Sequence, residues 1–154
     1  MSTDLRAVNA ALVAGSAVLD QGRRLNALSR SVTWVALLTG TVGALLGGGP
    51  ALSFASLAVV AVIAGLVELW FAARVDLDAQ LFRHLGEEAR AGRLDLASFD
   101  AGMHLAGLMR APTATRGVAE RLAGARRLLG WQAVACMAQL LLMIAAGALA
   151  WVRP

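Results

Sequence analysis

Three long stretches of the chain are almost entirely apolar. They cover residues 32–49, 51–73 and 128–152, and together they contain one ionisable carboxylate, Glu68, and no basic residue. An apolar run of about 18 residues or more can cross the hydrocarbon core of a bilayer as a helix. The pattern therefore predicts an all-α polytopic membrane protein with three transmembrane helices.

The composition supports the same class of protein. Hydrophobic residues make up 58% of the 154 residues, whereas a soluble globular domain has about 45–50%. Cys136 is the only cysteine and lies in the middle of the third apolar stretch, so we expect a small packing residue there and no internal disulfide. Asp4 stands where a secretory signal peptide would carry basic residues, so no such peptide is predicted.

The first 31 residues have an amphipathic pattern. Apolar or small residues recur every three or four positions from Leu5 to Leu28, and most of the charged residues lie between them. This spacing is typical of a helix with one apolar face. Residues 1–31 are therefore predicted to form an amphipathic N-terminal helix at the membrane surface, which leads directly into the first span.

A sharp turn is predicted between the first two spans, at Gly47–Pro50. Glycine readily ends a helix and proline readily begins one, so residues 32–73 should form a tight helical hairpin. Gly43 and Gly47 form a GxxxG motif in the first span, and Ala61 and Gly65 form a similar motif in the second. Small residues at this spacing favour close packing of membrane helices.

Residues 74–127 form a polar segment that is also helical in pattern. Leucines at four-residue spacing run from Leu77 and end near Gly92, and a second helical stretch begins at Asp95. Pro112 should break the chain, and Thr113 or Thr115 could cap the following helix. That helix can continue through the third span, residues 128–152, which leaves residues 153–154 as a short tail.

The distribution of arginine predicts the orientation. Most arginines lie in the N-terminal arm and the central segment, and none lies at the hairpin tip. The positive-inside rule then places the N-terminus and residues 74–127 in the cytoplasm and the C-terminus outside. Four tryptophans lie near the ends of the predicted spans, as in an interfacial aromatic belt: Trp34, Trp70, Trp131 and Trp151.

The charge of the chain requires only a lipid partner. The net charge is +4, and every basic residue is arginine, which codon usage in a GC-rich genome explains. Arginines beside a membrane face anionic lipid headgroups, so no nucleic acid is needed as a partner. We expect a bacterial inner membrane as the location.

Glu68 is the carboxylate inside the second span. Glu68 and Arg30 are equally far in sequence from the hairpin turn, so they are predicted to lie at the same depth near the cytoplasmic interface. There Glu68 should form a salt bridge with Arg30 or extend its carboxylate to the interface. The alternative is a carboxylate that handles protons or cations, because ionisable groups inside spans are often functional. The nearby Trp70 and Arg74 favour the structural interpretation.

Two amides lie on one face of the third span. Gln132 and Gln139 are seven residues apart, and Ala135 lies close to the same face. Buried amides can hydrogen-bond across a contact between membrane helices. We expect this face to pack against the hairpin. Docking of another subunit and the lining of a pore are the alternatives.

The central segment contains two pairs of potential metal ligands. His84 and Glu88 are four residues apart, as are Asp100 and His104, so two facing helices could present four ligands. Solvated helix faces with charge pairs explain the same spacing more simply. No metalloprotease, phosphate-binding or serine-hydrolase motif is present. We therefore expect no enzymatic activity and no cofactor.

A three-span protein without an internal repeat offers little interior for a transport pathway. The sequence thus favours a non-catalytic membrane protein that acts by association, as a small subunit or adaptor of a larger membrane complex or with copies of itself. The alternative is a homo-oligomeric channel or pore, although the polar positions of the third span end at Gln139.

Overall fold

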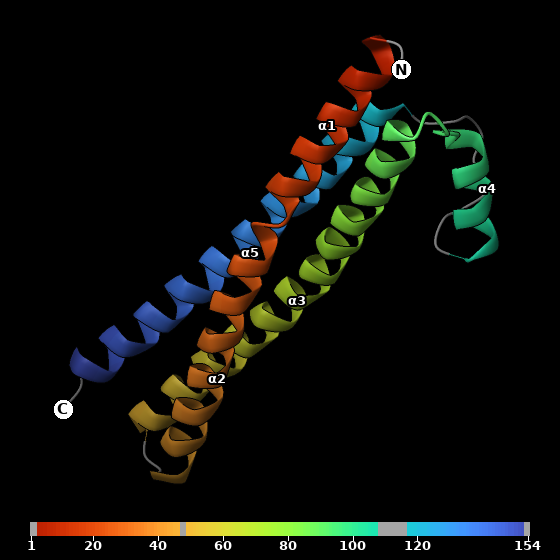
Figure 1. Cartoon of the computed structure of the whole chain (residues 1–154). Coiled ribbons are helices and arrows are strands. Elements are labelled where there is room, and N and C mark those ends of the chain that lie inside the picture. Colours follow the sequence, from red (N-terminus) through yellow and green to blue (C-terminus); the bar gives the residue numbers. More distant parts are fainter. Residues whose placement is uncertain (1–2, 47–48, 108–116, 153–154) are drawn as a thin grey trace. The chain divides into compact units, whose positions relative to one another are not determined.

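The computed structural model describes residues 3–46, 49–107 and 117–152, and this part of the chain consists of helices joined by short turns, without strands. Figure 1 shows the helices coloured in chain order. The helices are α1 (Thr3–Leu19), α2 (Gly22–Leu46), α3 (Gly49–Arg90), α4 (Leu96–Leu105) and α5 (Val118–Val152).

The chain forms two compact units, and α3 and α5 contribute residues to both. Unit 1 contains Met1–Leu19 and Leu77–Arg127, and unit 2 contains Asp20–Asp76 and Leu128–Pro154. Unit 2 is therefore built from α2, the N-terminal part of α3 and the C-terminal part of α5. Unit 1 is built from α1, α4 and the remaining parts of α3 and α5.

In unit 2, α3 packs through a stripe of mostly small residues. Its buried positions recur every three or four residues, which is the spacing of helices that pack side by side: Ala58, Ala61, Gly65, Glu68, Ala72 and Val75. The residues of α2 meet those of α3 in antiparallel order, because Gly22 lies against Val75 and Gly40 lies against Ala58. Small side chains on both helices let the backbones approach closely.

Unit 1 has a more conventional apolar core. Leu12 and Leu19 of α1 are almost fully buried, as are Phe82 and Leu85 of α3. Gly15 of α1 lies directly against Leu122 of α5.

A capped helix and an ion pair complete this unit. The Asp95 side chain accepts hydrogen bonds from the backbone N–H groups of Ala97 and Ser98 and so caps α4. Arg121 of α5 donates to both carboxylate oxygens of Asp100 in α4, at 2.6 and 2.7 Å.

In the part of the chain that the structure describes, two helices are long and apolar enough to cross a membrane. They cover Ala55–Arg90 in α3 and Val118–Leu149 in α5, and only 28% and 22% of their most apolar windows are buried. A core helix of a soluble protein would be mostly buried. The predicted spans 51–73 and 128–152 lie in these two helices. The predicted span 32–49 coincides with α2 as far as Leu46, but α2 is not among the helices that meet this test. The span over residues 32–49 therefore stays a prediction.

The predicted N-terminal helix over residues 1–31 is wrong in its length. The first helix ends at Leu19, and Gly22 already begins α2. The backbone N–H of Arg23 donates to the Asp20 carbonyl, which closes the turn between the helices. Gly22 leaves no room for a side chain, because a Cβ there would come within 2.9 Å of both Val75 and Gln132.

The other predicted boundaries agree better. The helix over the leucine repeat ends at Arg90, and Gly92 takes the positive φ of 73° expected beyond a helix end. This helix is continuous with the predicted second span, so α3 has 42 residues. The helix into the third span is unbroken as predicted. Gly47, Pro112, Thr113 and Thr115 lie outside the described residues.

Candidate functional site

A network of buried polar side chains joins the three helices of unit 2. At one end, Gln132 of α5 uses both hydrogens of its side-chain Nε2. One hydrogen bond goes to the carbonyl oxygen of Gly22 in α2, at 2.8 Å, and the other goes to Glu68 Oε1 in α3, at 2.7 Å. A single amide therefore links all three helices.

Glu68 is completely enclosed by this arrangement. Its side chain has no exposed surface, and neither does that of Gln132. Glu68 Oε2 and Gln132 Oε1 are buried and have no hydrogen-bond partner. Buried polar atoms are nearly always hydrogen-bonded, so two bare acceptors on adjoining side chains mark an unusual site.

At the other end of the network, Gln139 is fully satisfied. Its Oε1 accepts a hydrogen bond from the Ser29 hydroxyl at 2.7 Å, and its Nε2 donates to Thr33 Oγ1 at 2.7 Å. The Thr33 hydroxyl in turn donates to the Ser29 carbonyl, at 2.9 Å. This half of the network has the complete hydrogen bonding typical of a structural contact.

Two glycines make room for the amides. A Cβ on Gly65 would touch Thr33 Oγ1 and would lie 2.7 Å from Gln139 Nε2. A Cβ on Gly22 would lie 2.8 Å from Gln132 Oε1. Each glutamine therefore occupies the space that a missing side chain leaves on a neighbouring helix.

The predicted salt bridge between Glu68 and Arg30 is wrong. Arg30 is exposed, whereas Glu68 is fully buried and bonded to Gln132. Two residues that are equally far in sequence from a hairpin turn lie at the same level along the two helices. This does not determine the directions in which their side chains point, and Arg30 lies next to Ser29, the buried position of that turn. Glu68 is part of the interior of unit 2.

The prediction for Gln132 and Gln139 is confirmed in its main form. Both amides are buried and pack against α2 and α3 of the same chain. Ala135 is half-buried beside them. Of the predicted helix-packing residues, Ala61 and Gly65 are buried and Gly43 is half-buried, while Gly47 lies outside the described residues. Both amides are enclosed by this chain and do not reach its surface.

The predicted metal ligands do not converge. No group of three or more potential ligands that could hold a metal ion occurs in the part of the chain that the structure describes. Arg93 donates to both oxygens of Glu88, at 3.1 and 3.0 Å, and holds the pKa of that carboxyl below its usual value. Asp100 is paired with Arg121. His84 and His104 are exposed. The two carboxylates thus have cationic partners from the protein itself.

The described tryptophan side chains lie on the surface. Trp34, Trp70 and Trp131 are 63%, 55% and 55% exposed. The Arg74 guanidinium lies 5.3 Å from the centre of the Trp70 ring, a cation–π contact. Trp151 is in the last turn of α5, and its side chain lies outside the described residues. Exposed tryptophans beside arginine are compatible with an interfacial belt.

Sequence reasoning missed the partners of the amides. Ser29 and Thr33 were not singled out, and neither was Gly22. One signal could have identified two of them, because small or hydroxyl residues recur every three or four positions along α2, at Ser29, Thr33, Ala36 and Gly40. Gly22 lies seven residues before Ser29, on the same face of the helix. A helix face identified only by the spacing of apolar residues does not include this stripe, because serine and threonine interrupt it.

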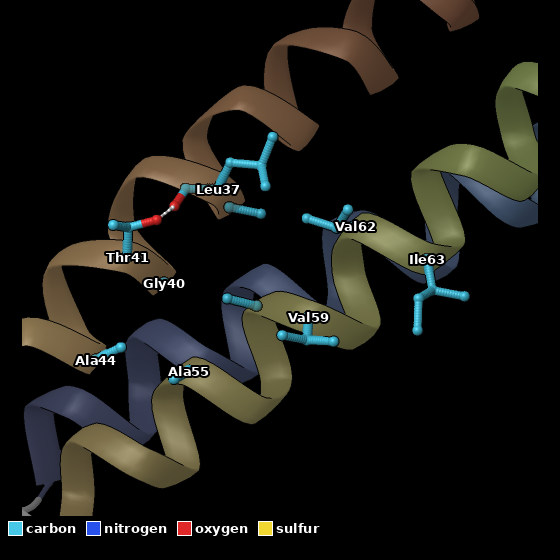
Figure 2. Close-up of a pocket in the computed structure, with 10 residues that line it drawn as sticks. Leu37, Gly40, Thr41, Ala44, Ala55, Val59, Val62 and Ile63 are labelled. Atoms are coloured by element: carbon cyan, nitrogen blue, oxygen red, sulfur yellow. Dashed lines mark hydrogen bonds between the residues drawn. The ribbon is translucent and has the colours of Figure 1, made fainter.

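A groove lies on the surface between α2 and α3. It has a volume of about 380 Å³, and small residues form much of its lining, including Gly40 and Ala44 of α2 and Ala55 and Ala58 of α3. Figure 2 shows the lining residues of the two helices on either side of it. The Thr41 hydroxyl already donates to the Leu37 carbonyl at 2.7 Å, so the groove offers little free polar chemistry.

Comparison of the chain with protein families, characterised proteins and solved structures finds no match.

Proposed function

We propose that this chain is a non-catalytic integral membrane protein that acts by association, as a subunit or adaptor of a larger membrane complex. The main observation in support of this proposal is the groove between α2 and α3. It is a hollow of small residues on an apolar surface, and such hollows let a second membrane helix approach closely.

The surface around the groove supports membrane insertion. Large apolar side chains of all three helices of unit 2 point outward, among them Leu38, Val59 and Ile144, which are 65%, 58% and 67% exposed. The polar side chains of Glu68, Gln132 and Gln139 point inward. In water this distribution would expose a large apolar patch, whereas in lipid it is the expected one.

The finer architecture is part of the proposal. Helix α2 is the first of three spans and forms a transmembrane hairpin with α3, and α5 supplies the third span. The arginine distribution favours a bacterial inner membrane, with the N-terminus and residues 74–127 in the cytoplasm and residues 153–154 outside.

The occupant of the groove is an apolar transmembrane helix of a partner protein. A helix can fill a hollow lined by alanine and glycine without a change in the α2–α3 contact. A homo-oligomeric channel has less support, since Gln132 and Gln139 are buried within one chain and the outward faces are apolar.

Native mass spectrometry of the tagged protein, gently extracted from membranes of its own host, tests the proposal. We expect a second polypeptide at fixed stoichiometry. The substitution Ala44→Leu fills the groove and should release that polypeptide. Ala138→Leu adds the same bulk at an exposed position of α5 outside the groove and should retain it.

Three results would contradict the proposal. A monomer with bound lipid alone would exclude a stable partner. A closed ring of copies would favour the channel. Equal loss of the partner in both variants would place the contact elsewhere on the surface.

A further inference from the structure

We propose that Glu68 is a proton-binding site inside unit 2, whose carboxyl group gains and loses a proton as the pH of the surrounding water changes. Association with a partner does not require such a site, so this inference goes beyond the proposed function. It rests on the charge balance and hydrogen bonding around one side chain.

The charge of an ionised Glu68 would have no counterpart nearby. The described arginine side chains of unit 2 are all exposed: Arg23, Arg24, Arg30 and Arg74. Arg23 is paired with Asp76, at 2.7 Å, and Arg74 lies over Trp70. The part of α5 that packs in unit 2 has no ionisable residue from Leu128 to Val152 other than Cys136. A buried carboxylate without a cation is strongly disfavoured in a low-dielectric interior.

The hydrogen bonding around Glu68 also lacks a partner, in this case a donor. Gln132 Nε2 uses both its hydrogens, on Gly22 and on Glu68 Oε1. This leaves Glu68 Oε2 and Gln132 Oε1 as buried acceptors without a donor. A proton on Oε2 would turn one of these acceptors into a donor. One proton would therefore remove the buried charge and supply the missing donor at the same place.

A proton fits the site better than a metal ion. Hard cations such as Ca²⁺ and Mg²⁺ take about six or more oxygen ligands. Of the described residues in unit 2, Glu68 and Gln132 offer two bare side-chain oxygens here, and one more, Asn26 Oδ1, lies on α2. A proton needs one carboxyl oxygen and one acceptor.

Other titratable groups around Glu68 are few. The Cys136 thiol on α5 is within electrostatic range of Glu68, and its Sγ lies 3.9 Å from the Leu25 carbonyl oxygen. From α2, the nearest charged side chains are the exposed arginines, and Asp20 is half-buried at the start of unit 2. A variant with Cys136→Ala separates titration of the thiol from titration of Glu68.

Infrared spectroscopy of the full-length protein in lipid vesicles tests the proposal directly. A protonated carboxyl group has a carbonyl stretching band that a carboxylate lacks. Other Asp and Glu carboxyls also give such a band when they are protonated, so the Glu68 band is the part of the wild-type spectrum that is missing from Glu68→Gln at the same pH. We expect this Glu68 band at low pH and its complete loss as the pH rises. The band should persist in Cys136→Ala and in Asp100→Asn, which removes the carboxylate paired with Arg121.

A chemical test uses the unmodified protein and so does not depend on folding of the variants. A hydrophobic carbodiimide takes the proton of a carboxyl group on its nitrogen, and the carboxylate oxygen then adds to its central carbon. The O-acylisourea rearranges to a stable N-acylurea that retains all atoms of both reactants. Peptide mapping should place this adduct on Glu68, and its yield should fall about tenfold for each pH unit once the carboxyl is ionised.

Three results would overturn the proposal. The first is a wild type whose carbonyl bands are the same as those of Glu68→Gln at every pH. The second is a band or a labelling yield that does not change with pH, because the proton would then be fixed. The third is a set of carboxylate bands that shift with added Na⁺ or K⁺ and disappear in Glu68→Gln, which would assign a metal cation to the site.

Discussion

Gln132 Nε2 donates a 2.7 Å hydrogen bond to Glu68 Oε1, and both side chains are completely buried. The two residues are 64 positions apart in sequence. The contact joins α3 to α5, and the second hydrogen bond of the same amide joins α5 to α2. Gln132 is therefore the residue whose removal should affect all three helices of unit 2.

The substitution Gln132→Leu should destabilise the protein. A hydrogen bond between membrane helices contributes only about 0.6 kcal/mol on average, but the change also leaves Glu68 and the Gly22 carbonyl without their donor. An unsatisfied buried polar group costs about 1–3 kcal/mol. We expect a loss in this second range by thermal or denaturant unfolding in detergent, followed by circular dichroism. Met137→Leu, at a position 57% exposed on the same helix, should change little. Equal stability of the two variants would show that the Gln132 contacts contribute nothing.

The substitution Gly65→Ala should also destabilise unit 2. The new Cβ would touch Thr33 Oγ1 and would lie 2.7 Å from Gln139 Nε2, so the amide would have to move. Overpacking of this kind costs about 1–3 kcal/mol. Gly130→Ala is the matched control, since no atom lies within 4 Å of its Cβ and alanine favours the helix. The free energy of unfolding should fall for Gly65→Ala and stay equal or rise for Gly130→Ala. The opposite order would disprove the close contact at Gly65.

Breaking the Asp100–Arg121 ion pair should release α4 from α5. The two side chains are 3% and 12% exposed, and removal of one partner of a buried pair costs about 3–5 kcal/mol. Hydrogen exchange of residues 96–105 should accelerate in Arg121→Gln. Arg93→Gln breaks an exposed pair with Glu88, worth about 0–1 kcal/mol, and should leave that exchange unchanged. Similar exchange in both variants would mean that α4 is held by other contacts.

The cap of α4 should weaken at low pH. The Ser98 hydroxyl and the backbone N–H groups of Ser98 and Ala97 donate to Asp95 and hold its pKa below the usual value. Because the native pKa is lowered, the stabilisation is complete above the unfolded pKa of about 3.9 and is lost as the pH falls through the native pKa. NMR shifts of the Ala97 and Ser98 amides should report this loss below about pH 4. Asp95→Asn keeps a capping side chain without a charge and should show no such titration. A normal or raised midpoint in the wild type would contradict the capping geometry.

The proposed orientation can be tested in intact cells. An impermeant thiol reagent should label a cysteine introduced by Gly48→Cys and should not label one introduced by Ala91→Cys. Cys136 is buried and provides the background in the parent protein. The reverse labelling pattern would place residues 74–127 outside the cytoplasm.

The sequence by itself predicted the features that depend on local patterns. Helical periodicity placed the helix that ends near Gly92 and the uninterrupted helix of α5, because apolar spacing and glycine act over a few residues. The seven-residue spacing of Gln132 and Gln139 placed both amides on one buried face. The length and apolarity of α3 and α5 followed from composition in the same way.

Tertiary structure decided which groups meet and where a side chain has no room. A side chain at Gly22, the first residue of α2, is excluded by Val75 and Gln132, which approach from other helices. Glu68 bonds to Gln132 and not to Arg30 because helix packing, and not distance from a turn, determines the direction of each side chain. Sequence spacing carries information along one helix only. The partners of a buried polar group come from other helices, so their identity depends on how those helices pack.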